Sequence, residues 1–228
     1  MKGGEAVIET LLAHGVDTAF TVPGESFLYA LEGLRRNADK IRTISVRQEG
    51  GGAFMAEAFG KLARRPAALF VSRGPGSSNA AIGIHTAMQD STPMLVFVGH
   101  VNSGSMGREA FQEIDQRSFF GSVAKAVLAT EDADNIPRIT AEAFRLSMEG
   151  RPGPVVVQIP RDVSSNETAA SILQPSPQET REPEEELIAK AKSMIDTAKA
   201  PLVVAGEMVC NQDASQALMD FVDAAALP

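Results

Sequence analysis

The segment from residue 45 to residue 60, SVRQEGGGAFMAEAFG, places one carboxylate where a strand pattern gives way to a helix pattern. Glu49 follows an apolar run and precedes three glycines. In parallel α/β folds, ligands bind at the carboxyl ends of strands, and glycine lets a flat ligand approach because it has no side chain. Glu49 is therefore either a group that shares a proton with a ring nitrogen or an acid that complements a helix dipole.

The composition restricts the class of protein. The 228 residues are enough for one large domain or for one domain and part of another. A net charge of −8, with no Trp and one Tyr, argues against a nucleic-acid partner. No segment is long and apolar enough for a membrane span. The single cysteine, Cys210, excludes an internal disulfide framework and favours a cytoplasmic location; we expect it to be buried.

Strand-like and helix-like segments alternate along the first 160 residues. Near-continuous apolar runs indicate strands of a parallel sheet that is covered by helices on both faces. The alternation predicts an α/β fold with a doubly wound parallel sheet. The expected strands are 18–22, 41–46, 67–71, 93–98, 123–128 and 154–159, and the expected helices are 4–14, 26–35, 52–63, 77–88 and 132–148.

The composition changes after Asp162. The following segment is rich in Ser, Thr, Pro and Glu, which is typical of an exposed linker. Beyond it we expect a helix at 184–198, a strand at 202–205 and a helix at 214–225, the start of a second α/β domain too short to bury its own core. The expected division is a first domain at 1–165, a linker at 166–183 and the truncated beginning of a central domain at 184–228.

Four turns marked by glycine or proline follow expected strands, at 23–25, at 48–52, at 72–79 and after Gly99. Because the carboxyl ends of parallel strands lie at one edge of a sheet, we expect these turns to meet there. The turn at 72–79 leads into a helix, whose N-terminal amides can hold a phosphate. Since it has no P-loop lysine and no GxGxxG pattern, a plain turn with Ser77 or Ser78 as the N-cap is favoured.

The loop after Gly99 is long and polar, and long loops in compact domains are often functional. It carries Phe111, Gln112 and Glu113, although a solvated loop anchored by Phe111 fits the same pattern. The three histidines are far apart in sequence and lack the spacing of metal ligands. We interpret His14, His85 and His100 as structural or surface residues and expect no metal site in this chain.

Taken together, the ordered motifs resemble the pyrimidine-binding domain of thiamine-diphosphate-dependent enzymes. The resemblance is closest to the acetolactate synthase and pyruvate oxidase group, and it covers residues 1 to about 165. The later part resembles the start of that group's central domain. The motifs are Pro23-Gly24-Glu25, Arg47 to Ala53, Gly74 to Asn79, Asp90 to Pro93, Phe111 to Glu113 and Arg151 to Asp162.

The resemblance implies an enzyme, a carboligase or decarboxylase that acts on 2-oxo acids. Glu49 matches the family's glutamate, which hydrogen-bonds the pyrimidine ring of thiamine diphosphate, and Gln112 would point toward the reacting centre. The cofactor would attack the substrate carbonyl and act as the electron sink for decarboxylation. The residues implied to bind the cofactor are Pro23, Gly24, Glu49, Gly76 and Asn79.

Two departures from the family pattern are visible. Gln48 stands where the family often has His, and the loop after Gly99 lacks the adjacent histidines of pyruvate decarboxylases, which favours the synthase and oxidase side. The family binds the diphosphate through Mg²⁺ on a separate domain, whose Gly-Asp-Gly…Asn motif is not found in these residues. FAD, which some members bind through the central domain, is an open alternative as an additional cofactor.

The resemblance also implies partners. In the family, the diphosphate-binding domain of a partner subunit completes the site, so the working protein is expected to be a homodimer or homotetramer. This chain by itself is then expected to be inactive.

Two other function classes stay open. One is a non-catalytic nucleotide-binding module, and the other is a dimerisation domain that has lost its activity. Glu49 separates them from the enzyme, because a carboxylate repels a phosphate and attracts a protonated ring nitrogen. The substrate stays open among simple 2-oxo acids, oxalyl-coenzyme A, and sulfo- or phosphonopyruvate.

Overall fold

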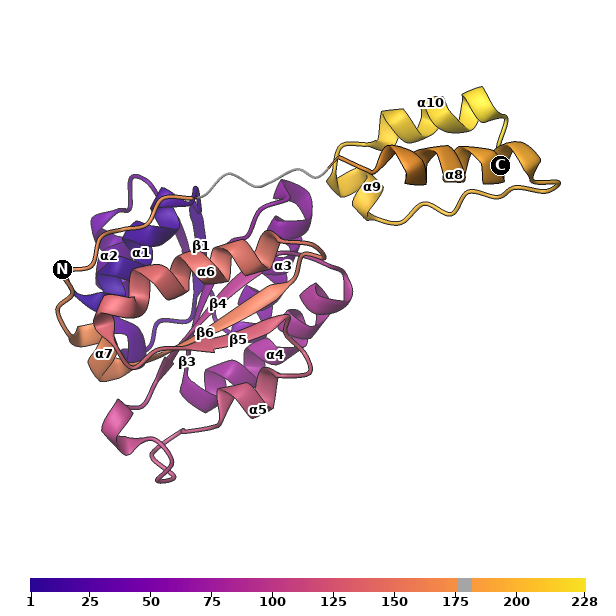
Figure 1. Cartoon of the computed structure of the whole chain (residues 1–228). Coiled ribbons are helices and arrows are strands. Elements are labelled where there is room, and N and C mark those ends of the chain that lie inside the picture. The colour runs from indigo at the N-terminus through magenta and orange to yellow at the C-terminus, as the bar shows by residue number, and fades with distance from the viewer. Residues whose placement is uncertain (176–181) are drawn as a thin grey trace. The chain divides into compact units, whose positions relative to one another are not determined.

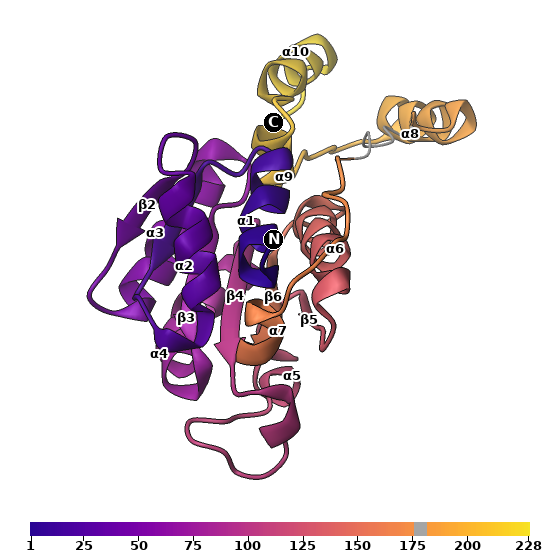
Figure 2. The same ribbon diagram turned by 90° about the vertical axis from the view of Figure 1, so that its left-hand side faces the viewer.

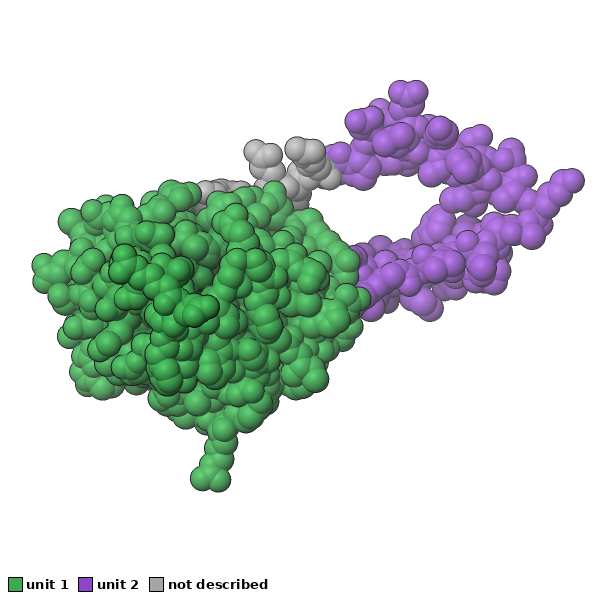
Figure 3. Space-filling view, turned by 90° about the horizontal axis from the view of Figure 1, so that it is seen from below, with its two compact units in different colours: residues 1–175 green, residues 176–228 purple. Residues whose placement is uncertain are grey.

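The computed structural model describes residues 1–175 and 182–228, which form two compact units, Met1–Pro175 and Ser176–Pro228 (Figures 1 and 3). Part of the expected linker, residues 176–181, lies outside the described residues.

The first unit is built on a six-stranded parallel sheet with the strand order β2-β1-β3-β4-β6-β5. The chain runs from β1 outward to β2 and then returns to place β3 on the other side of β1. The strand order therefore reverses between β1 and β3, and such a switch point is where open α/β sheets bind ligands. The strands are β1 (Thr18–Thr21), β2 (Arg42–Ser45), β3 (Ala68–Ser72), β4 (Met94–His100), β5 (Ala126–Ala129) and β6 (Pro154–Pro160).

Helices cover both faces of this sheet, as Figures 1 and 2 show. One face carries α1 (Gly3–Ala13), α2 (Leu28–Arg36) and α6 (Ile136–Met148). The other carries α3 (Glu49–Ala63), α4 (Arg73–Gln89) and α5 (Gln116–Phe120). A short helix α7 (Arg161–Ser165) and the 3-10 turns η1 (Glu25–Phe27), η2 (Ser103–Ser105) and η3 (Ala133–Asn135) complete the unit. The expected doubly wound α/β fold is confirmed.

The central strands are apolar throughout because both of their faces are covered. Every residue of β4 is buried, and its side chains alternate between the two hydrophobic clusters. Phe97 stacks on Phe70 of β3, with ring centroids 5.0 Å apart, on the face that carries α1. Burying one such ring stabilises the fold by roughly 1.5–3 kcal/mol, so these strands fix the position of the residues that follow them.

Two helices begin earlier than the sequence predicts. Helix α3 starts at Glu49 rather than at residue 52, because the side chain of Gln48 accepts a hydrogen bond from the Gly51 N–H at 2.9 Å. Helix α4 starts at Arg73 rather than at residue 77. Ser77 and Ser78 therefore lie inside the helix, and their interpretation as N-caps is wrong.

The residues after α7 pack against the first unit. The Gly3 N–H donates a hydrogen bond to the Asn166 carbonyl at 2.9 Å, and Lys2 forms an isolated antiparallel bridge with Glu167. Thr168 is buried, and its hydroxyl donates to Asp134 at 2.6 Å. This unit extends to Pro175, whereas the expected domain boundary is at residue 165.

In the second unit, the described residues form α8 (Glu185–Thr197), α9 (Met208–Asn211) and α10 (Ser215–Ala225). The strand expected at 202–205 is absent from the described part, because no other strand of this unit is present there to pair with it. Leu202 and Val204 are instead 72% and 87% exposed. Cys210 is also exposed, so the expectation that it is buried is wrong. Leu227 is the only buried residue among the described residues of this unit, which leaves no core to enclose a thiol.

Candidate functional site

The carboxyl ends of β1 and β3 are joined directly at the switch point. The hydroxyls of Ser26, after β1, and Ser72, at the end of β3, form a hydrogen bond at 2.7 Å. A Cβ atom on Gly24 would lie 2.9 Å from the Cβ of Ser72, so the turn can approach β3 only because residue 24 is glycine. At the end of β4, a Cβ on Gly99 would lie 2.4 Å from the Ser26 hydroxyl oxygen. The turns after these three strands therefore meet at one edge of the sheet.

The turn after β2 joins the same edge through Glu49. This carboxylate is half-buried at the first position of α3, and the Asn79 side-chain amide donates a hydrogen bond to its Oε2 at 2.9 Å. A Cβ on Gly76 would lie 3.4 Å from Glu49 Oε1. Among the described residues, no donor is placed on Oε1. One carboxylate oxygen is thus held by the protein, and the other lies beside a residue without a side chain.

The carboxylate oxygen that is unpaired among the described residues sets what this arrangement can do chemically. A carboxylate oxygen accepts a hydrogen bond from a protonated ring nitrogen, and it can share that proton during a reaction. Gly76 and Gly24 allow the backbone to approach Glu49 and Ser72 closely, because a Cβ at either position would contact those residues. The edge is also open, since Pro23 and Asn79 are exposed.

Gln112 contacts the start of α4 through its backbone. It lies in the loop between β4 and α5, and its carbonyl accepts a hydrogen bond from the Gly74 N–H at 2.9 Å. Its φ of 65° is in the left-handed region, and its side chain is exposed. The structure therefore places Gln112 against the first turn of α4, the helix that carries Gly76 and Asn79. Figure 2 shows this loop projecting beyond the end of β4.

Arg73 and Glu25 form an ion pair that is not predicted from the sequence. The Arg73 side chain is only 10% exposed, its φ is 45°, and its Nη2 donates to Glu25 Oε1 at 2.5 Å. Glu25 lines a cavity of about 450 Å³ together with Tyr29, Asn102 and Arg161. No signal in the local sequence identifies this pair, because a charged residue such as Arg is mostly exposed and the burial of Arg73 depends on the tertiary fold.

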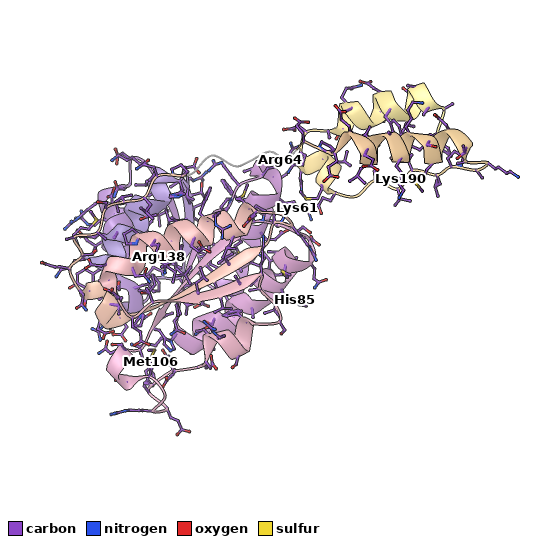
Figure 4. All side chains as sticks on the ribbon, viewed as in Figure 1. Lys61, Arg64, His85, Met106, Arg138 and Lys190 are labelled. Atoms are coloured by element: carbon purple, nitrogen blue, oxygen red, sulfur yellow. The ribbon has the colours of Figure 1, made fainter. Side chains whose placement is uncertain are left out.

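The three histidines occupy different settings. His14 is the C-cap of α1, with its Nδ1 2.8 Å from the Thr10 carbonyl, and His85 is exposed on α4 (labelled in Figure 4). His100 ends β4 and is 2% exposed, and its Nδ1 has no hydrogen-bond partner among the described residues. Burial lowers the pKa of His100, while the charge of Glu113 opposes the shift and the charge of Arg73 adds to it. His100 is therefore a buried, neutral group at the site's edge.

A sequence profile of the family described as thiamine pyrophosphate enzyme, N-terminal TPP binding domain, matches residues 1–119, just over half of the chain. The chain belongs to this family. The resemblance stated from the motifs is thereby confirmed, and thiamine diphosphate (TPP) is the cofactor of the family. The matched range includes Glu49, Gly76, Asn79 and Gln112.

Relatives of the chain are acetolactate synthases. The acetolactate synthase catalytic subunit, mitochondrial, of Saccharomyces cerevisiae is 31% identical over 244 residues, which cover 100% of this chain and 35% of that protein. The large subunits from Lactococcus lactis and Corynebacterium glutamicum are 32% and 33% identical over the whole chain, which covers 40% and 37% of their lengths. This TPP-family chain thus spans two fifths or less of the length of these relatives.

Proposed function

We propose that the complete protein is a thiamine-diphosphate-dependent carboligase or decarboxylase of 2-oxo acids, similar to acetolactate synthase, and that this chain supplies the pyrimidine half of its site. The observation that carries the proposal is the Glu49 carboxylate, fixed through Oε2 by Asn79 while Oε1 lies beside Gly76. The family supports the proposal as well, because this chain belongs to the thiamine pyrophosphate family and its relatives are acetolactate synthases.

Each residue has a distinct role in this account. Glu49 accepts a hydrogen bond from the pyrimidine ring and holds a proton at that nitrogen, and Asn79 orients its carboxylate. Pro23, Gly24 and Gly76 shape the space for the ring. Gln112 lies on the side where the substrate approaches, next to the first turn of α4. When bound, the cofactor supplies the nucleophilic carbon and the electron sink for the reaction.

We propose that the diphosphate and Mg²⁺ are held elsewhere, on the diphosphate-binding domain of a partner subunit. Mg²⁺ requires an octahedral set of oxygen ligands. The described residues hold no group of three or more His, Cys, Asp or Glu side chains that could bind a metal ion. FAD stays an additional candidate cofactor, and flavin absorbance of the purified complete gene product tests it.

An exposed apolar surface supports a second copy of the chain as the partner. Helices α3 and α4 pack closely, and their outer faces expose Phe54 at 42%, Met55 at 41% and Ile82 at 61%. Grouped exposed apolar side chains indicate an interaction site. We propose a homodimer through this surface. Sedimentation of the complete gene product tests it, since Ile82→Glu should shift the wild-type dimer toward monomer, and a wild-type monomer would contradict it.

We propose a cytoplasmic location, supported by the single cysteine and by the bacterial acetolactate synthase relatives. The S. cerevisiae relative is mitochondrial. None of the helices in the described part of the chain is long and apolar enough to cross a membrane.

A nucleotide-binding module is not favoured. Such a module would place phosphates at the first turn of α4, where helix amides are available. Glu49 Oε1 lies beside Gly76 in that turn, and its negative charge would repel the phosphates.

The test of the proposal is carbon dioxide release from a panel of 2-oxo acids by the complete gene product. Thiamine diphosphate and Mg²⁺ are each omitted in turn. Release that requires the cofactor establishes the reaction class, and the analysis of products separates carboligation from simple decarboxylation. No release from any acid, although the cofactor binds, would contradict the proposal.

A further inference from the structure

The loop that carries Gln112 is closed on itself by a single carboxylate. Glu113 Oε1 accepts a hydrogen bond from the Gly107 N–H at 2.6 Å, and Oε2 accepts one from the Ala110 N–H at 2.9 Å. The Glu113 N–H in turn donates to the Ala110 carbonyl at 2.9 Å. The side chain therefore ties Glu113 to two other points of the loop, and these two charge-assisted bonds are stronger than bonds between neutral groups.

The same hydrogen bonds keep the carboxylate ionised. The Gly107 N–H, and next the Ala110 N–H, hold the pKa of Glu113 below its ordinary value of 4.5. The carboxylate therefore stays charged, and able to accept both bonds, to a lower pH than an ordinary Glu.

Both ends of the loop are fixed to the first unit. At its start, the Ser103 N–H donates to Asp162 at 3.0 Å, and the Ser103 hydroxyl donates to the same carboxylate. Within it, Gln158 Nε2 lies 3.6 Å from the sulfur of Met106, which Figure 4 labels beside this loop. At its end, Asp115 caps α5. With these ends fixed, the closure by Glu113 decides how the middle of the loop lies.

Gln112 precedes Glu113 and holds a backbone conformation that non-glycine residues rarely adopt, with a φ of 65°. Such a conformation persists only where neighbouring contacts determine it. The contacts here are the Gly74 N–H bond to the Gln112 carbonyl and the Glu113 bonds on the other side. Without Glu113, the backbone hydrogen bond to Gly74 and the packing of Ile114 at Gly74 would be the remaining contacts that hold this part of the loop against α4.

We propose that Glu113 is a positioning residue: by closing the loop it fixes Gln112 in its left-handed conformation against the first turn of α4. Only one part of the inference rests on the proposed function, namely that Gln112 acts on the substrate. Glu113 itself need not touch cofactor or substrate, since both of its oxygens are engaged by the backbone of the loop.

The first test needs no activity and uses the 228-residue chain. Amide hydrogen exchange is measured by NMR for wild type, Glu113→Gln and Glu109→Gln. Glu109 is an exposed acid of the same loop and controls for loss of one charge. We expect Glu113→Gln to speed exchange of the Gly74, Gly107 and Ala110 amides at least tenfold, since one amide loses its acceptor and the charge is gone. If these amides exchange at the same rate in Glu113→Gln as in Glu109→Gln, Glu113 does not hold the loop closed.

The second test uses the kinetics of the complete gene product. Glu113→Gln should lower kcat at least tenfold and leave KM within about twofold, because Gln112 acts on the reacting group and the binding surface is unchanged. Glu113→Asp, which keeps the charge and can hold one amide, should recover part of kcat, and Glu109→Gln should match wild type.

The two tests separate the possible failures. A wild-type protein without turnover contradicts the proposed function, while the exchange result still decides whether Glu113 holds the loop. If Gln112→Ala lowers kcat and Glu113→Gln does not, Glu113 does not position Gln112. If Gln112→Ala leaves kcat unchanged, Gln112 has no role that needs positioning, and the functional part of the inference is overturned as well.

Discussion

The side-chain amide of Asn79 donates a hydrogen bond to Glu49 Oε2 at 2.9 Å, which joins the first turn of α3 to the second turn of α4. The bond leaves Glu49 Oε1 directed toward Gly76. The orientation of the carboxylate therefore depends on a residue thirty positions away in the sequence.

Removing this amide should impair catalysis without unfolding the protein. Asn79→Ala releases Glu49 to rotate, and we expect kcat of the complete gene product to fall about tenfold. Asn79→Asp should lower kcat further, because a second carboxylate beside Glu49 repels the Glu49 carboxylate. Circular dichroism should show an unchanged fold, because Asn79 is exposed. Asn79→Ala with wild-type kcat would show that Glu49 does not depend on Asn79.

The packing of α3 on α4 predicts opposite effects for two glycines. A Cβ on Gly83 would lie 2.6 Å from the Cβ of Ala53, so Gly83→Ala should lower the free energy of unfolding by about 1–3 kcal/mol. A Cβ on Gly51 meets no atom within 4 Å, and Gly51→Ala should raise it by about 0.5–1 kcal/mol through helix propensity. Urea unfolding of the chain measures both. The same sign for both variants would contradict the close helix contact.

The ion pair between Arg73 and Glu25 should contribute to stability. Losing one partner of a buried pair costs about 3–5 kcal/mol, but the Glu25 side chain is 58% exposed, so we expect about 1 kcal/mol for Glu25→Gln. If the two groups act on each other, Glu25→Gln should cost much less in an Arg73→Met background. Equal costs in both backgrounds, measured by urea unfolding, would show that the pair contributes nothing.

The buried His100 side chain should make the free energy of unfolding depend on pH near neutrality. Burial holds the pKa of folded His100 below its ordinary value of 6.5, so between the two values the unfolded chain binds more protons than the folded chain. The free energy of unfolding should therefore fall as the pH drops below about 6.5, and the fall should stop below the folded pKa. Glu113, whose pKa is lowered from 4.5, contributes a separate loss only at more acidic pH.

The measurement is urea unfolding of wild type and His100→Gln from about pH 7 to about pH 5. The wild type should lose more stability over this range than the variant does. Equal slopes would mean that His100 titrates in the folded protein as it does in the unfolded chain.

The fold could be predicted from the sequence because the central strands are apolar without interruption. Runs such as 67–71 and 94–98 are buried on both faces of the sheet. Their uninterrupted apolar sequence therefore identifies them as central strands without any knowledge of their tertiary contacts. The meeting of the glycine turns followed from the parallel topology alone. The first residues of the helices were harder to predict, because Gln48 is the N-cap of α3 and glutamine is uncommon at that position.

The remaining parts of the site depend on contacts between distant segments. Nothing in the local sequence shows that Arg73 becomes buried and meets Glu25, or that Glu113 turns back onto Gly107. The strand expected at 202–205 failed for a related reason. Its apolar residues match a strand pattern, but a strand forms only where another strand is present to accept its hydrogen bonds.

The central claim is that Glu49 holds a proton at the pyrimidine ring of thiamine diphosphate, and its direct test is kcat of the complete gene product with Glu49→Gln. An amide cannot take up that proton, so we expect kcat to fall at least about 100-fold, with the thermal midpoint unchanged. Glu131→Gln, at an exposed acid after β5, which β4 and β6 separate from β3 in the sheet, should keep wild-type kcat. A Glu49→Gln protein with kcat within about twofold of wild type would contradict the account.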